Sequence, residues 1–91
     1  MVLIIISIGG PRAAAFEALL TNERSGDVIH IDEDGRTAHV VPICNRPRGM
    51  VRGLVDSHVI IACSDDHKVI IYNRAARAIE SEISPVRGAM N

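Results

Sequence analysis

The stretch GDVIHIDEDGRTAHVVPI, residues 26–43, limits the fold more than any other part of the chain. Its two halves, DVIHID and TAHVVPI, are rich in the β-branched residues typical of strands. Asp34-Gly35 between them favours a two-residue hairpin turn. Only the four residues 33–36 separate the two strands, whereas a parallel pair needs a crossover of about a dozen residues. The sequence therefore predicts an antiparallel hairpin over 27–32 and 37–43, with His30 opposite His39.

Composition points to one small folded domain. The chain has 91 residues, of which 47% are hydrophobic and 23% charged, with one Phe, one Tyr and no Trp. We expect a single domain over 1–84 and a loose tail over 85–91, because Pro85 stops the last element. A core made of small aliphatic side chains has a thin margin of stability. Association into a homo-oligomer is one usual remedy, and we expect it here.

No targeting signal is visible in the sequence, so a cytoplasmic location is the default expectation. VLIIISI, residues 2–8, is too short to span a membrane and lacks the basic start and cleavage site of a signal peptide. It reads instead as a buried central strand. The net charge of −1 argues against a protein-wide basic field for nucleic acid. Cys44 and Cys63 have no metal-site spacing, and in a cytoplasmic protein a disulfide between them is not expected.

Two helices complete the predicted fold. Good helix formers after Pro11 predict one helix over 11–23, which Ser25-Gly26 ends. The helical spacing of Tyr72, Ala76, Ile79 and Ile83 predicts a second over 65–83. Ser64 would cap the second helix. The β-branched run KVII gives a strand at 68–71 as the alternative to this part of the helix.

The remaining elements are a loop over 45–56, with a short helix at 49–54, and a buried strand SHVIIAC. The predicted fold class is α/β: one mixed four-stranded sheet in the order β-α-β-β-loop-β-α. No internal repeat is apparent in the sequence.

The first segment resembles a known class of nucleotide-binding domain. VLIIISIGGPRAAAFEALL is similar to the first β-α unit of Rossmann-type domains, in particular those of siroheme synthase and of TrkA-type potassium-transport regulators. These families also have a late strand followed by two aspartates, similar to VIIACSDD. The resemblance implies that NAD(P) or another nucleotide binds where the strand ends gather. The residues it implicates are Gly9, Gly10, Arg12, Asp32, Glu33, Ser64 and Asp65.

A second resemblance covers the middle of the chain. Residues 27–63 look like part of the ATPase core of phage terminases and helicases, but the chain has no G-x-x-x-x-G-K-[ST] phosphate loop. This resemblance implies a phage-type accessory protein that self-associates or binds a protein partner without a small ligand.

NRPRGMVRG places Arg46, Arg48 and Arg52 within seven residues. Arginines in a glycine-containing loop can clamp phosphates or nucleic acid. The alternative is a solvated loop whose arginines pair with the acidic tip of the hairpin. Nucleic acid is not the expected partner, because no aromatic residue among the arginines offers base stacking.

Two other groups of polar residues could have a catalytic or metal-binding role, or a purely structural one. His30 and His39, with Asp32, could hold a metal, although cross-strand histidine pairs without metal are commoner. Asp65 and Asp66 could act as an acid–base pair, or simply occupy a helix N-terminus. No nucleophile and base have recognisable spacing. The sequence therefore favours a non-catalytic binding or regulatory module, with no metal.

Overall fold

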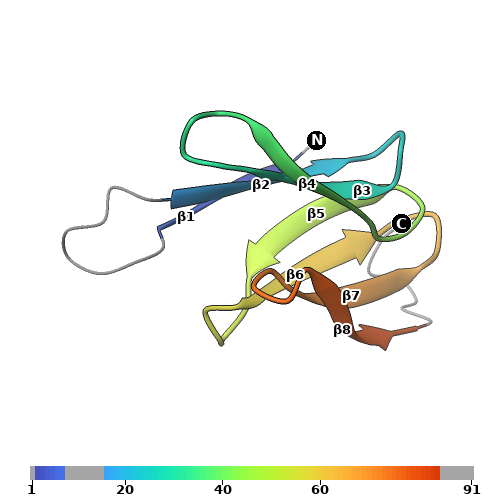
Figure 1. Ribbon diagram of the computed structural model, residues 1–91. Coiled ribbons are helices and arrows are strands. Elements are labelled where there is room, and N and C mark those ends of the chain that lie inside the picture. Colours follow the sequence, from blue (N-terminus) through green and yellow to red (C-terminus); the bar gives the residue numbers. More distant parts are fainter. Residues whose placement is uncertain (1, 8–15, 85–91) are drawn as a thin grey trace.

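A computed structural model describes residues 2–7 and 16–84, and every regular element in this part of the chain is a strand (Figure 1). The predicted α/β, Rossmann-like fold is therefore wrong, and the described chain is all-β. The strands are β1 Val2–Ser7, β2 Phe16–Asn22, β3 Asp27–Ile31, β4 Thr37–Pro42, β5 Pro47–Arg52, β6 His58–Cys63, β7 Lys68–Asn73 and β8 Ala78–Ile83.

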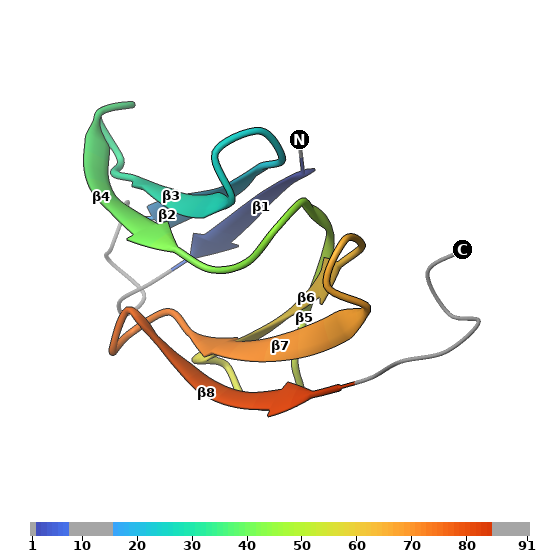
Figure 2. The same ribbon diagram turned by 90° about the vertical axis from the view of Figure 1, so that its right-hand side faces the viewer.

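The strands form two four-stranded antiparallel sheets, each connected in chain order. We call β1–β4 the first sheet and β5–β8 the second sheet. They lie one above the other (Figures 1 and 2), with β5 running beside β1 and β2. The core lies between them and contains Leu19, Val28, Ile43, Met50, Val59, Ile61, Cys63, Ile70 and Tyr72.

The predicted hairpin is present as β3 and β4. They pair antiparallel with His30 opposite His39 and Ile29 opposite Val40, as expected. The turn differs from the prediction. A β-bulge after His30 pairs Ile31 with Thr37, and the Asp32 carbonyl accepts the Gly35 amide. Gly35 alone in this turn has positive φ, +80°. The turn therefore ends at a glycine in the left-handed conformation. The predicted two-residue turn would instead need positive φ at both of its central residues.

The helix predicted over 11–23 is wrong over its described part, because residues 16–22 form β2. Residues 8–15 lie outside the described residues. Along β2 the side chains alternate, with Leu19 and Thr21 buried between the sheets and Leu20 half-buried on the other side. Helix propensity is a weak preference that tertiary packing overrides. Pairing with β1 and β3 on both sides satisfies the backbone of β2 as a strand.

The helix predicted over 65–83 is also wrong, and the alternative strand at 68–71 is right. β7 and β8 form a hairpin whose turn is stabilised by the Asn73 side chain, which accepts the Ala76 amide at 2.9 Å. The β-branched run of β7 alternates in burial, with Ile70 and Tyr72 completely buried. The predicted loop over 45–56 contains β5 instead of a short helix.

Over the inner strand pairs, β2–β3 and β6–β7, the two sheets are copies of one pattern, displaced by 41 residues. The shift takes the cross-strand pair Leu20–Ile29 to Ile61–Ile70. It also takes the β-bulge after His30 to the one after Ile71. Gly26, in the turn after β2, has φ +76°. Its equivalent 41 residues later is His67, in the turn after β6, which has φ +50°. An internal repeat is therefore present in the structure although the sequence does not display it.

A disulfide joins the two sheets. It links Cys44, in the connection after β4, to Cys63 at the end of β6, with Cα atoms 6.1 Å apart. The expectation that these cysteines stay unbonded is therefore wrong. Among the described residues no helix is long and apolar enough to cross a membrane.

Candidate functional site

Of the predicted nucleotide site, the structure describes Asp32, Glu33, Ser64 and Asp65. Gly9, Gly10 and Arg12 lie outside the described residues. Phe16–Asn22 is a strand rather than the helix that the site requires. Asp32 is committed to its own turn, where its Oδ1 accepts the amides of Asp34 and Arg36, each at 3.0 Å.

The remaining members of that site lie at opposite ends of β3. Asp32 and Glu33 follow its last residue, whereas Asp65 lines a pocket together with Ser25 and Gly26, just before its first residue. Five strand residues span on the order of 16 Å. Ser64 lies beside Asp65, and its amide donates to the Arg46 carbonyl at 3.1 Å. The structure therefore does not bring Asp32 and Asp65, two described members of the predicted site, together.

The arginines are on a strand and its approach, not in a flexible loop. Arg46 precedes β5 with φ +54°, and Arg48 and Arg52 belong to β5. Arg46 pairs with Asp65 at 3.9 Å and Arg48 with Glu23 at 3.3 Å. Their partners are therefore the turns after β2 and β6, rather than the tip of the β3–β4 hairpin.

A shallow polar pocket of about 300 Å³ opens among these turns, lined by Glu23, Arg24, Ser25, Gly26, Asn45, Arg46, Asp65 and Asp66. Asp66 accepts both the backbone and the side-chain amide of Asn45, at 2.9 and 3.0 Å. These two hydrogen bonds lower the pKa of Asp66, the backbone bond most. The pocket has acids and arginines in near balance, so it presents no uniform field to an anion.

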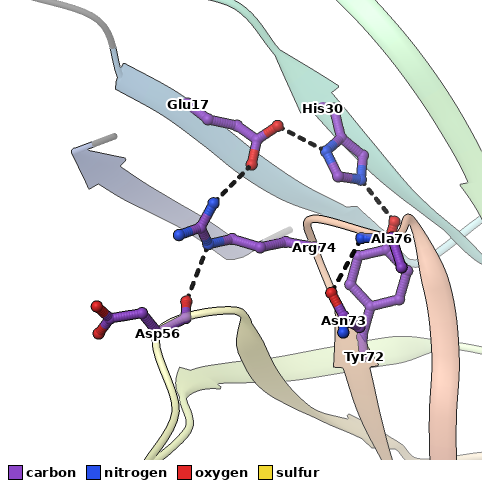
Figure 3. A network of polar contacts seen from close by, with 7 residues as sticks. All are labelled: Glu17, His30, Asp56, Tyr72, Asn73, Arg74 and Ala76. Carbon is purple, nitrogen blue, oxygen red and sulfur yellow. Dashed lines mark hydrogen bonds and ion pairs between the residues drawn. The ribbon is translucent and has the colours of Figure 1, made fainter. Parts of the chain in front are cut away.

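A more ordered polar group lies between the sheets (Figure 3). His30 on β3 contacts Glu17 on β2 through Nδ1, at 2.9 Å, and the Tyr72 hydroxyl on β7 through Nε2, at 2.6 Å. Because a carboxylate only accepts, Nδ1 donates to Glu17 and Nε2 accepts from Tyr72. Arg74 lies 3.8 Å from the other Glu17 oxygen and donates to the Asp56 carbonyl at 3.0 Å.

A carboxylate, an imidazole and a hydroxyl in series resemble the groups of a proton relay. Here both His30 and Tyr72 have 0% exposure, so no substrate reaches the hydroxyl. Burial, followed by the negative charge of Glu17, raises the pKa of Tyr72 to about 12. The hydroxyl therefore stays protonated and donates to His30. The role of the Glu17–His30–Tyr72 group is therefore structural. It satisfies the hydrogen bonds of buried polar atoms and holds the second sheet against the first.

The histidine pair does not form a metal site. The rings of His30 and His39 are 5.9 Å apart, edge to face, but both His30 nitrogens are occupied by Glu17 and Tyr72. Within the described part of the chain, no group of three His, Cys, Asp or Glu side chains is placed to hold a metal ion.

The outward face of the second sheet is aliphatic across all four strands. The inward side chains of β6 and β7 pack on the first sheet, and their neighbours in the sequence point the other way. Cross-strand pairs Val51–Ile60, Ala62–Val69, Ile60–Ile71 and Val69–Ile83 run across this outward face. Val51 is 59% and Ile83 57% exposed. We call Val51, Ile60, Ala62, Val69, Ile71 and Ile83 the second open face.

The first sheet has a matching outward face. Leu20 and Ile29 are cross-strand partners, as are Ile29 and Val40. Leu20, Ile29 and Ile31 are half-buried, and Val40 is 53% exposed. We call these four residues the first open face. Contiguous exposed apolar surface of this kind commonly marks an interaction site.

Comparison with models of known protein families finds no match, and neither does comparison with curated protein sequences. The sequence analysis located neither open face. It predicted Leu20, Val69, Ile71 and Ile83 in helices, Val51 in a loop, and Ile60 and Ala62 in a buried strand, and it assigned no outward face to the hairpin over 27–43. The available signal was the β-branched content of VIHI and VIIY.

Proposed function

We propose that this chain is a non-catalytic protein-interaction module that binds through the aliphatic outward faces of its two sheets. The observation that carries this proposal is the second open face, six aliphatic residues on four neighbouring strands. Monomeric proteins rarely leave a contiguous apolar surface of this kind exposed to water.

Three other features support a binding role over a catalytic one. The one relay-like group, Glu17–His30–Tyr72, has its histidine and tyrosine fully buried. The polar pocket is shallow and has mixed charge. Arg46 and Arg48 are paired with acids, which weakens the case for nucleic acid as the partner of these arginines.

The disulfide bears on where such a module would work. Disulfides persist in oxidising compartments and are rare in the cytosol. The Cys44–Cys63 bond therefore supports an oxidising environment over the cytoplasmic location expected from composition.

A hydrophobic dye tests whether the faces are available. At high dilution, where any assembly dissociates, the wild-type chain should bind the dye, and the double variant Val51→Lys/Ile83→Lys should bind several-fold less. Leu54→Lys is the matched control, because Leu54 is fully exposed in the turn between β5 and β6, away from either face. If the wild type binds no dye, or the face variant binds as much as the control, the proposed function is wrong.

A further inference from the structure

We propose that the partner of each open face is the other open face of a second copy of this chain, in a head-to-tail assembly. This inference rests on the proposed function, since it names the partner of the same surface. It is carried by the 41-residue repeat, which relates the open faces to the interface already formed between the two sheets.

The second open face is the counterpart of the inward face of the first sheet. The 41-residue shift takes Leu19, Thr21, Val28 and His30 to Ile60, Ala62, Val69 and Ile71. The first four are completely buried against the second sheet. The four counterparts hold the equivalent positions on the second sheet. Within the described part of the chain, no further sheet covers them, and they face outward.

Apart from Val40, whose counterpart by strand pairing is the exposed Glu82, the first open face is likewise the counterpart of the inward face of the second sheet. Leu20, Ile29 and Ile31 correspond to Ile61, Ile70 and Tyr72. Those three are completely buried against the first sheet. The operation that places the second sheet on the first would thus place the first open face of one copy on the second open face of another. Such a contact is heterologous, and its repetition gives either a closed ring or a filament.

The chemistry of the two faces fits this contact. In the internal interface, His30 and Tyr72 need each other and Glu17 to satisfy their polar atoms. The counterparts of His30 and Tyr72 on the open faces are Ile71 and Ile31, which have no polar side-chain atoms, and the counterpart of Glu17 is His58, whose Nε2 already pairs with Glu80 at 3.1 Å. Aliphatic side chains then meet aliphatic side chains, and burying them is favourable.

The edges of the second sheet are less suited to association than its open face. β8 has Glu80 and Glu82, and β5 begins with Pro47 and has Arg48 and Arg52. Proline and charged residues on edge strands oppose pairing with another strand. A second copy should therefore meet the second sheet through its face rather than by extending it.

Face-to-face stacking of successive four-stranded antiparallel sheets is also the arrangement in β-propellers, which close a ring with roughly four to eight sheets. Because each copy supplies two sheets, closure would take about two to four copies.

Mixing two blocked variants tests the head-to-tail arrangement. Ile29→Lys/Val40→Lys blocks the first open face, and Val51→Lys/Ile83→Lys blocks the second. Sedimentation velocity should show that the wild type and Leu54→Lys assemble and that each blocked variant alone is a monomer. An equimolar mixture of the blocked variants should give a heterodimer, because each supplies the face that the other lacks.

Other results would overturn the inference. If either blocked variant dimerises alone, its remaining open face binds the same face of another copy, and the head-to-tail inference is wrong. If the wild type is monomeric at every concentration yet binds the hydrophobic dye, the faces serve another partner: the head-to-tail inference falls and the proposed function stands. Circular dichroism checks that the variants fold, and the single variants Val40→Lys and Val51→Lys replace any double variant that does not.

Discussion

Gly26 shows how a single residue position is fixed by a segment distant in the sequence. Its φ of +76° is unfavourable for residues with a side chain, and a Cβ there would lie 2.4 Å from the Cys44 carbonyl oxygen. The Gly26 carbonyl in turn accepts the amide of Ile43 at 2.8 Å. The equivalent position in the second sheet holds His67 with φ +50°. The conformation alone therefore does not require glycine; the close passage of the chain at Cys44 does.

Two alanine variants separate conformation from contact. Gly35→Ala should cost about 1–2 kcal/mol of unfolding free energy, since φ is +80° but nothing lies within 4 Å of its added Cβ. Gly26→Ala pays the same conformational cost and also collides with backbone, so it should cost clearly more. Urea denaturation measures both values. Equal losses would mean that the connection after β4 moves aside freely.

Tyr72 should make stability depend on pH in the alkaline range. Its pKa is raised to about 12 from an ordinary value of 10.0, chiefly by burial. A raised pKa means that the folded state holds the proton when the unfolded chain has lost it. The contribution is complete below pH 10 and is lost as pH rises from 10 to about 12, at about 1.4 kcal/mol per pH unit.

The measurement is direct because Tyr72 is the only tyrosine. Tyrosinate absorbance should titrate near pH 12 in the folded chain and near 10 in denaturant. Tyr72→Phe should flatten the alkaline fall in stability. Titration of the folded chain near pH 10 would show that water reaches the hydroxyl and that the contact with His30 does not seal it.

At the scale of elements, the strands that the sequence predicted correctly are marked by a sharp turn or by a continuous apolar run. The pairing of β3 with β4 follows from the short Asp-Gly turn, and β1 and β6 follow from apolar runs. β2 and β8 were missed and β7 was given only as an alternative, because apolar residues in short strands also fit a helical spacing; β5 was predicted as part of a loop. For β7, the β-branched residues were the better signal, since they favour an extended backbone.

The candidate site was less predictable than the fold. The glycines and acids were assigned to one site because the helix predicted over 11–23 would have brought them to one end of a sheet. Once Phe16–Asn22 is a strand, Asp32 and Asp65 lie at opposite ends of β3. The Glu17–His30–Tyr72 contact joins three strands and two sheets, so no local pattern could indicate it.

The disulfide should be a major source of stability for the pair of sheets. It closes a chain segment with a sequence separation of 19. Loop-closure entropy for a segment of this length predicts a loss of about 3 kcal/mol on its removal. Cys44→Ser/Cys63→Ser, or reduction of the wild type, should lower the denaturation midpoint accordingly, and reduction should not affect the double variant. An unchanged midpoint in both cases would show that the noncovalent contacts between the sheets suffice.

At the scale of the whole molecule, the repeat explains why both outward faces are aliphatic. Each sheet is built to be covered on two sides, as sheets in stacked repeats are. Within the described chain one side of each is covered by the other sheet, and the disulfide and the His30 contacts secure that interface. The open faces have the pattern of the covered ones without the polar network, which is the basis for expecting a further copy on each side.

Cross-linking at equivalent positions tests this account most directly. His30 and Tyr72 meet between the sheets, and the 41-residue shift makes Ile71 of one copy face Ile31 of the next. With the native cysteines bonded to each other, Ile31→Cys and Ile71→Cys each add one free thiol. With a short bis-maleimide, a mixture of the two variants should give cross-linked dimers. Each variant alone, and Leu54→Cys mixed with either, should give only a background level. Dimers formed equally well by a single variant, or a mixture no more cross-linked than the Leu54→Cys control, would contradict the head-to-tail account.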